Sequence, residues 1–473
     1  MSGKRVFVVD AGGRGNAIAH AFAKSGEVER VYVAPGNAGS EMMDKCRLAD
    51  LGGKAPRTIA EMLDFAARED IDLTFVGPEG YLSDGIVNVF QEAGRMIVGP
   101  TKEAAVLENS KCSTKDLLKR LNVPVPPCEN FSDAAAAKEY ARQYCAEHPG
   151  KGLVVKADGL AAGKGSIVCS GEKEACSAIE RIMESPRLFG AAGDRIEIEE
   201  QLEGRELMFF ALSDGRTVKP LQSALDYKQA FAADEAVAVR LFNKLSKNPC
   251  LDSNPNTGGM GGFSPHPWLD EDLTERIMNR IAIPTVRGFK ETTGHEYVGV
   301  IYFGLMISDD RQPSVLEINV RLGDPEAEVI LPRLETDFFL LSRAILDRRL
   351  DSVPLQWSGD YCLGVCAVSG RAIKPLSSGS EEERPGYPGE HYTNMPITGL
   401  EKVDPDVLVY HNGTAFAPEG SGRRKLFTTG GRVLTLVARG KSLAEARVRA
   451  YDNIKRIRFN GMRYRKDIGL GYI

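Results

Sequence analysis

Residues 154–168 hold the side-chain types that bind phosphate groups. Two runs of β-branched residues flank a glycine-rich loop, with Lys156 in the first run and Lys164 in the loop. Glycines let backbone amides approach phosphate oxygens, and lysines neutralise their charge. The segment therefore predicts a strand–loop–strand lid, and a flexible hairpin without a ligand is the alternative. It is not a Walker loop, because the spacing G-x-x-x-x-G-K-[ST] is absent.

A second candidate site lies on a predicted strand that carries Glu317, Asn319 and Arg321. The period of two in a strand places these three side chains on one face. Two oxygen donors beside a cation suit a magnesium ion that is bound to phosphates, because magnesium keeps few protein ligands. The alternative is a half-exposed strand. Asp324 and Glu326 follow at once and are expected beside that face.

Two further segments could contribute to the same site. Residues 256–262 form a glycine-rich loop that could close over a substrate, and residues 199–204 follow a strand pattern at 195–198. A strand end can offer main-chain groups to an adenine edge, although a solvated acidic turn is the better reading of this segment taken alone. Nine scattered cysteines without a C-x-x-C pair, and six scattered histidines, predict neither a disulfide framework nor a zinc site.

The elements that position these residues are clearest at the start of the chain. Strand patterns (5–10, 30–34, 73–77 and 96–98) alternate with helical ones (17–24, 59–68 and 84–93). This alternation predicts a parallel sheet covered on both faces, with ligands at the carboxyl ends of its strands. Loops 12–16, 35–37 and 77–79 lie there. The first is not a dinucleotide motif, because its glycine spacing is not G-x-G-x-x-G; it is either an anion-binding loop or a tight turn.

Two more regions follow the first. Residues 101–331 open with one helical stretch, 103–121, and a proline-rich link at 123–127. Residues 332–473 show strands near 361–368 and 432–438, a helix near 443–457, and a polar loop at 377–386.

The composition is that of a protein with several domains and without a membrane span. A length of 473 residues suggests about three domains. The net charge of −5, from 60 basic and 65 acidic residues, argues against a nucleic-acid partner. The longest uncharged apolar run, about eleven residues, is shorter than a membrane span needs. The start of the chain lacks a signal-peptide pattern, so a cytoplasmic protein is expected.

Together these features resemble the ATP-grasp superfamily: a lysine on a helix, a lysine strand with a glycine lid, an acidic hinge and a Glu-x-Asn strand. More narrowly, the chain resembles the glycinamide ribonucleotide synthetase (phosphoribosylamine–glycine ligase) family over nearly its whole length. The motifs that carry this resemblance are residues 34–39, 76–79, 155–165, 256–261, 323–326, 411–414, 430–433 and 465–469.

The resemblance implies an α/β protein with the ATP-grasp fold. An N-terminal doubly wound parallel-sheet domain (1–105) would precede an ATP-grasp region (106–331, with a lid subdomain at about 123–195) and a C-terminal α+β domain (332–473). It also implies ligation: ATP, with Mg²⁺ or Mn²⁺, would phosphorylate the carboxylate of glycine, and the amine of phosphoribosylamine would attack the acyl phosphate. The implied partners are these small molecules only, and a monomer or homodimer is expected. A site of this kind needs no protein nucleophile, and the sequence shows no nucleophile signature.

The site residues carried over from the family fall into four groups. Those implied for ATP are Lys111, Lys156, Gly163, Lys164, Gly165, Glu199, Glu200, Leu202 and Glu206. Those implied for catalysis are Arg321, Asp324 and Lys156, and those for the metal are Glu317 and Asn319. Those implied for the substrates are Gly13, Arg14, Asn16, Gly36, Asn37, Pro78, Glu79, Asp226, Lys228, Asn256, Thr257, Gly258, Gly259, Gly323 and Glu326.

Lys156 lies among apolar residues, where an unpaired ammonium would be costly. A bound polyphosphate would explain its presence. The variant Lys156→Met is therefore expected to fold normally and to lose ATP affinity.

Two departures from the family bear on the amine. The family loop usually reads Gly-Gly-Arg-Glu-His-Ala, whereas this chain has Gly15 and Asn16 in place of the Glu-His pair. In addition, 22 residues (232–253) stand where the family usually has a short link. A related ligase for a different amine in a specialised pathway is thus one alternative, and a degenerate nucleotide-binding protein is another. We expect phosphoribosylamine to remain a substrate, and Gly15→Glu with Asn16→His not to abolish its use.

Overall fold

The computed structural model describes residues 3–160, 165–184, 187–246, 254–375, 381–417 and 425–473. It begins with a five-stranded parallel sheet in the order β3-β2-β1-β4-β5. Its strands are β1 (Lys4–Asp10), β2 (Val28–Pro35), β3 (Cys46–Leu48), β4 (Leu73–Val76) and β5 (Ile97–Val98). Its helices are α1 (Gly13–Ala23), α2 (Gly39–Met42), α3 (Ile59–Arg68), α4 (Glu79–Ser83) and α5 (Ile86–Glu92). The predicted doubly wound sheet is confirmed.

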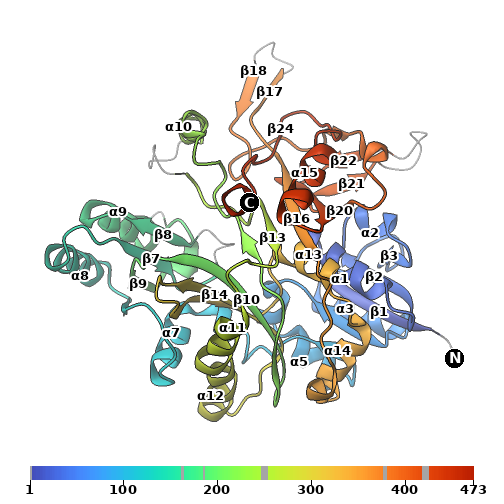
Figure 1. The fold of residues 1–473 in the computed structure, drawn as a ribbon, viewed down its shortest axis with the longest axis horizontal. Coiled ribbons are helices and arrows are strands. Elements are labelled where there is room, and N and C mark those ends of the chain that lie inside the picture. Colours follow the sequence, from blue (N-terminus) through green and yellow to red (C-terminus); the bar gives the residue numbers. More distant parts are fainter. Residues whose placement is uncertain (1–2, 161–164, 185–186, 247–253, 376–380, 418–424) are drawn as a thin grey trace.

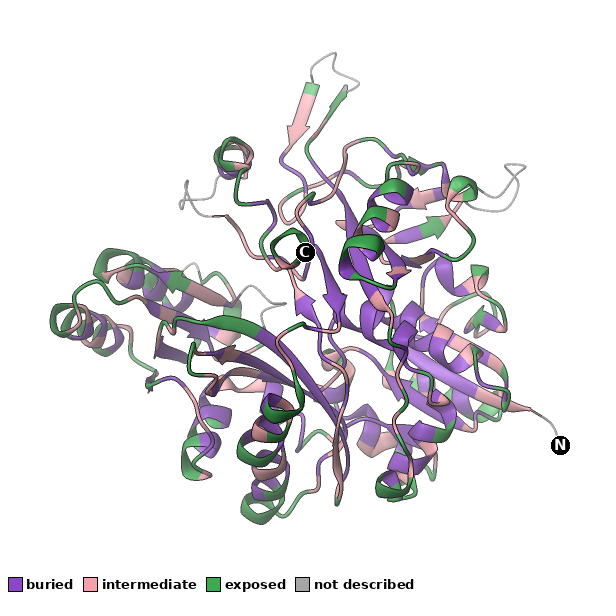
Figure 2. Cartoon of the chain, viewed as in Figure 1, coloured by how far each residue is buried: buried purple, intermediate pink, exposed green. Residues whose placement is uncertain are grey.

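Alternation along β1 explains why helices cover both faces of this sheet. Phe7 and Val9 pack into one hydrophobic cluster with Phe65 of α3. Val6 and Val8 pack into a second cluster with Phe22 of α1. Successive side chains of a strand point to opposite faces, so a strand that is apolar throughout needs a cover on each side. Figure 2 shows these strands buried and the outer faces of the helices exposed.

The middle of the chain contains two antiparallel sheets. The first, in the order β6-β9-β7-β8, consists of β6 (Cys128–Phe131), β7 (Leu153–Ala157), β8 (Ser166–Cys169) and β9 (Ile196–Glu200). Helices α8 (Ala134–Glu147) and α9 (Glu172–Met183) cover it, and this layer projects from the rest of the molecule in Figure 1. The second, in the order β11-β10-β14-β15, consists of β10 (Arg205–Asp214), β11 (Val218–Pro220), β14 (Val298–Ile307) and β15 (Pro313–Asn319). The same region contains one continuous helix. It consists of α11 (Glu271–Ile277), a π-helical turn (Met278–Ala282) and α12 (Ile283–Thr293).

The single helix expected over 103–121 is wrong. The chain forms two helices, α6 (Val106–Asn109) and α7 (Lys111–Arg120), which are separated at Ser110. Ser110 has extended backbone angles, and its hydroxyl accepts a hydrogen bond from the amide of Ser113. A serine N-cap starts a new helix in this way, and it places Lys111 at the first position of α7.

A fourth sheet joins distant parts of the chain. Its order is β12-β13-β16-β23-β20, and β24 also pairs with β16. It contains β12 (Leu225–Asp226), β13 (Gly261–Ser264), β16 (Tyr361–Ser369), β20 (Leu408–His411), β23 (Arg432–Gly440) and β24 (Met462–Arg463), and α15 (Leu443–Ile454) packs on it. Two strands from the middle of the chain therefore extend the C-terminal sheet.

The remaining elements link or decorate these layers. The short helices α13 (Glu326–Ile330) and α14 (Phe338–Leu346) follow β15. A hairpin of β17 (Ala372–Pro375) and β18 (Glu381–Arg384) projects at the top of Figure 1, so β18 occupies part of the segment predicted as a polar loop. A small sheet contains β19 (Pro396–Ile397), β21 (Thr414–Phe416) and β22 (Leu426–Thr428). No helix among the described residues is long and apolar enough to cross a membrane.

The 22-residue insertion forms one helix, α10 (Ala236–Leu245), in its described part. Phe242 of this helix stacks edge-on against Phe231, with ring centres 5.7 Å apart. Asn254 closes the base of the insertion, because its amide oxygen accepts from the Phe231 amide (3.1 Å) and its amide nitrogen donates to the Phe231 carbonyl (2.8 Å). The two ends of the insertion are thus held side by side.

Candidate active site

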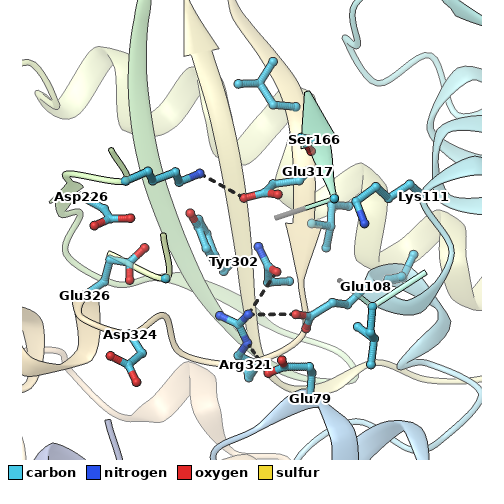
Figure 3. Close-up of a pocket in the computed structure, with 18 of the residues that line it drawn as sticks. Glu79, Glu108, Lys111, Ser166, Asp226, Tyr302, Glu317, Arg321, Asp324 and Glu326 are labelled. Atoms are coloured by element: carbon cyan, nitrogen blue, oxygen red, sulfur yellow. Dashed lines mark hydrogen bonds and ion pairs between the residues drawn. The ribbon is translucent and has the colours of Figure 1, made fainter. Parts of the chain in front are cut away.

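A cavity of about 340 Å³ lies where the N-terminal domain, β15 and the fourth sheet meet. It is lined by Arg14 of α1 and Glu79 of α4, by residues of β15, and by loops before β13 and after β15. In Figure 3, Asp226, Glu326 and Asp324 lie along one side, Lys111 lies on the opposite side, and Glu317 and Arg321 lie between them. The cavity therefore combines cations and carboxylates drawn from all three regions.

The β15 wall carries the residues predicted for a metal. Glu317 and Asn319 both line the cavity. Glu317 stands opposite Gly304 of β14, where the missing side chain leaves room for it. The Lys228 ammonium lies 3.3 Å from the Glu317 carboxylate and, against the effect of burial, lowers the pKa of that carboxyl to about 2. Glu317 is thus ionised at every ordinary pH.

Arg321 anchors the junction between β15 and the first sheet. Its guanidinium contacts the carboxylates of Glu79 (3.2 Å) and Glu108 (3.0 Å), and it donates to the Asn319 side chain (3.4 Å). Burial acts to raise the pKa of Glu79, but Arg321 and Arg14 hold it below its usual value. Two carboxylates therefore fix Arg321 at the cavity wall.

The carboxyl groups of Asp226 and Glu326 lie together on the acidic side of the cavity. Glu326 is buried, and one carboxylate oxygen of Asp226 is buried without a hydrogen bond from the described residues. Burial and the proximity of Glu326 raise the pKa of Asp226 well above its usual value. Burial likewise raises the pKa of Glu326. Two carboxyl groups that resist ionisation together are suited to a cationic ligand.

Asp324 and Glu328 form a second pair of carboxyl groups. The Asp324 carboxylate contacts Arg432 of β23 at 2.8 Å. Glu328, four residues later, is fully buried, and neither of its oxygens accepts a hydrogen bond from the described residues. Burial and the Asp324 charge raise the pKa of Glu328 well above its usual value. Burial therefore makes ionisation of Glu328 unfavourable, and no sequence signal marked this residue.

Lys156 has protein partners, which corrects the premise that its ammonium is unpaired. It contacts Glu199, lies 3.8 Å from Glu197 and donates to the Leu316 carbonyl (2.8 Å). Lys115 contacts the same two glutamates (2.8 and 3.8 Å). These four charged side chains form a neutral buried cluster under β15, so burial of Lys156 does not require a bound polyphosphate.

The predicted hinge residues lie outside the cavity lining. Glu199 points into the buried cluster, and Glu200 contacts Lys151 at 2.8 Å. Leu202 is half-buried and Glu206 is exposed. Lys111 lines the cavity and donates to the Gly159 carbonyl (3.2 Å). Gly165 lines it too, whereas Gly163 and Lys164 lie outside the described residues.

Asn16 and Asn37 form a buried network that joins the first sheet to β20. The Asn16 amide donates to Asn37 and to Ser40 (both 3.2 Å), and its oxygen accepts from the amide of His411 (3.0 Å). Asn37 donates to the carbonyl of His411 (2.6 Å). Both side chains therefore make hydrogen bonds that join protein segments to one another.

The predicted residues therefore divide by position. Those that line the cavity are Arg14, Glu79, Lys111, Gly165, Asp226, Lys228, Asn256, Thr257, Gly258, Glu317, Asn319, Arg321, Asp324 and Glu326. The described ones outside its lining are Gly13, Asn16, Gly36, Asn37, Pro78, Lys156, Glu199, Glu200, Leu202, Glu206, Gly259 and Gly323. Sequence reasoning missed Glu108, Lys115, Tyr302 and Arg432, which also line it.

The fold and the cavity define an ATP-grasp protein. Similar solved structures include biotin carboxylase from Campylobacter jejuni, with a TM-score of 0.64 and 16% identity over 99% of this chain and 94% of that one. At this identity the likeness shows the fold alone.

Family models identify the chain more narrowly. Those of phosphoribosylglycinamide synthetase match its N domain (residues 4–108), its ATP-grasp (A) domain (109–327) and its C domain (384–471). The chain belongs to this family. Phosphoribosylamine–glycine ligase of Archaeoglobus fulgidus is 47% identical over 98% of this chain and 99% of the relative, and that of Vibrio vulnificus is 39% identical over 98% and 97%. The crystal structure of the Thermotoga maritima ligase has a TM-score of 0.75 and 28% identity, covering 98% of this chain and all of that one.

Proposed function

We propose that this chain joins the carboxylate of glycine to the amine of 5-phosphoribosylamine at the expense of ATP. The observation that carries the proposal is the full-length match, at 47% identity, to a relative named phosphoribosylamine–glycine ligase. The cavity is consistent with this chemistry, because it sets cations for phosphate groups opposite carboxyl groups suited to an amine.

The reaction needs an activated carboxylate. Glycine's carboxylate attacks the terminal phosphorus of ATP, ADP leaves, and an acyl phosphate forms. The amine then attacks the acyl carbon, the carbon–oxygen bond to phosphate breaks, and the proton lost by nitrogen leaves with the phosphate. Positioning and electrostatic stabilisation supply most of the catalysis in phosphoryl transfer.

The described residues divide this work by charge. Lys111 and Arg321 would stabilise the negative charge on the transferring phosphoryl group, and Arg321 is already fixed by two carboxylates. Asp226 and Glu326 would hold the glycine ammonium, whose positive charge would offset the repulsion between the two buried carboxyl groups. Asp324 would face the acyl phosphate, with Arg432 holding its carboxylate in place.

Glu317 and Asn319 fit Mg²⁺, or Mn²⁺, by the chemistry of their donors. A carboxylate and an amide oxygen are hard ligands on one strand face, and magnesium takes its other ligands from phosphates and water. When bound, the ion would neutralise phosphate charge. In this structure Lys228 contacts the same Glu317 carboxylate.

The organisation and context proposed here follow the family. We propose domains at 1–105, 106–331 (with a lid subdomain at about 123–195) and 332–473. ATP, glycine and phosphoribosylamine would be the partners of a cytoplasmic monomer or homodimer.

The test is ADP release by the purified protein with glycine and freshly generated phosphoribosylamine. A panel of other primary amines at equal concentration serves as the control. We expect glycine-dependent ADP release with phosphoribosylamine and with none of the other amines. Release with another amine, and none with phosphoribosylamine, would overturn the assignment and favour a specialised ligase.

A further inference from the structure

Asp10 is a buried carboxylate at the end of β1 that the sequence motifs did not mark. Its side chain accepts hydrogen bonds from the amide of Gly12 (2.8 Å) and from the Arg14 guanidinium (2.7 Å). Asp10 and Arg14 are only 3% and 7% exposed. A charge-assisted hydrogen bond between two buried partners fixes the orientation of both.

Arg14 presents the rest of its guanidinium to the cavity. Its Nη1 donates to the Leu322 carbonyl (3.2 Å), and its Nε is used by Asp10. Its Nη2 makes no hydrogen bond to the part of the chain that the structure describes, and Arg14 lines the cavity beside Glu79 and Arg321. A guanidinium held on one edge and free on the other suits a phosphate or a sugar hydroxyl.

Glycines make room for the Asp10 carboxylate. A Cβ placed on Gly15 would lie 2.5 Å from the Asp10 Cβ, and one placed on Gly77 would lie 2.0 Å from an Asp10 carboxylate oxygen. Asp10 therefore occupies the space into which a side chain at position 15 would grow. The expectation that Gly15→Glu with Asn16→His would not abolish the use of phosphoribosylamine stays a prediction, and the Gly15→Glu change in it would collide with Asp10.

We infer that Asp10 supplies, from β1, the carboxylate that the family loop carries at position 15, and that it positions Arg14 for the phosphoribosyl part of the acceptor amine. The inference rests on the proposed function, since it names the residue that orients one wall of the acceptor site. Gly15 is then the necessary partner of Asp10, and the two positions together keep one carboxylate beside Arg14.

The test compares the wild-type protein with Asp10→Gly, Gly15→Glu and the double variant that carries both changes. Loss of one hydrogen bond between charged groups predicts a rise of about tenfold to a hundredfold in KM for phosphoribosylamine in Asp10→Gly, with KM for glycine unchanged. Gly15→Glu alone should be impaired by its collision with Asp10. The double variant returns a carboxylate to the same space and should recover to within about threefold of the wild type.

Two further variants separate positioning from folding. Asp10→Asn keeps an acceptor for the Gly12 amide but removes the charge that holds Arg14. Its matched control is Asp64→Asn, which breaks an aspartate–arginine pair of the same four-residue spacing at 2.8 Å on the exposed face of α3. The first should raise KM for phosphoribosylamine, and the control should leave it unchanged.

A binding measurement makes the result independent of turnover. Calorimetry with ribose 5-phosphate should rank the wild type and the double variant above Asp10→Gly and Gly15→Glu. If that ranking holds but phosphoribosylamine gives no ADP release, the proposed acceptor is wrong and the role of Asp10 stands. A double variant that binds no better than Asp10→Gly, or a wild type that does not bind, would overturn the inference.

Discussion

Lys156→Met is expected to destabilise the protein, in contrast to the expectation from sequence that it folds normally. The substitution leaves Glu197 and Glu199 buried with only Lys115 as a cation. Removal of one partner from a buried ion pair costs about 3–5 kcal/mol. Because Lys115 remains and Glu197 can take up a proton, about 3 kcal/mol is the expected loss, or roughly 6–12 °C in Tm for a domain of this size.

The pH dependence of this loss follows from the carboxyl groups. Burial raises the pKa of Glu197 to about 7, whereas Lys156 and Lys115 hold the pKa of Glu199 below its usual value against burial. Without Lys156 both values rise. A carboxyl with a raised folded pKa has no cost below the unfolded value of about 4.3, and its cost grows as pH rises toward the folded value. The deficit should therefore be larger at pH 8 than at pH 5.

The assay is thermal unfolding of matched variants at both pH values. Lys138 is the control, because it too contacts two glutamates, Glu180 and Glu184 (both 2.8 Å), but on the exposed surface of α8 and α9. Exposed ion pairs contribute at most about 1 kcal/mol, so Lys138→Met should change Tm little at either pH. Equal shifts for both variants, or a Lys156→Met shift independent of pH, would refute the reasoning.

Three further outcomes are expected. Glu317→Gln should abolish glycine-dependent ADP release while ATP binding by calorimetry weakens only moderately, because one ligand charge is lost from the metal face; near-native release at saturating Mg²⁺ would contradict the metal assignment. Glu328→Gln should gain stability over the wild type as pH rises above about 4.3, because burial raises the pKa of the wild-type carboxyl in the fold and makes its ionisation costly; a pH-independent difference in urea denaturation would argue against a raised pKa of Glu328. Phe242→Ala should expose α10 to limited proteolysis without changing KM for glycine, and unchanged cleavage would show that the Phe231 contact does not hold this helix.

Local patterns in the sequence predicted the N-terminal sheet, and the resemblance of the motifs to a known family implied the rest of the fold. The strand–helix alternation of the first hundred residues and the alternation along β15 depend only on residues close in sequence. Ser110 shows where such reasoning ends, since a serine inside a helical pattern does not reveal whether it caps a new helix. The glutamates of β18 read as a loop because hairpin pairing with β17 is not visible in polarity alone.

The site was less predictable because its charges are balanced across distant segments. Lys156 looked unpaired, since its partners Glu197 and Glu199 lie on another strand. No sequence motif marked Asp10, because its proposed role in holding Arg14 depends on the absence of a side chain at Gly15. Motifs identify residues that face a ligand more readily than residues that hold those residues in place.

The clamp at Asn254 has a consequence for how this chain can vary in length. The Asn254 side chain hydrogen-bonds to both main-chain groups of Phe231. It therefore holds the two ends of the insertion together, whatever the number of residues between them. Loop closure costs only about 0.6 kcal/mol for each doubling of length. The segment between Phe231 and Asn254 is therefore a permissive position, where lengthening, shortening or a grafted peptide would leave the register of the adjoining substrate loop at Asn256 unchanged.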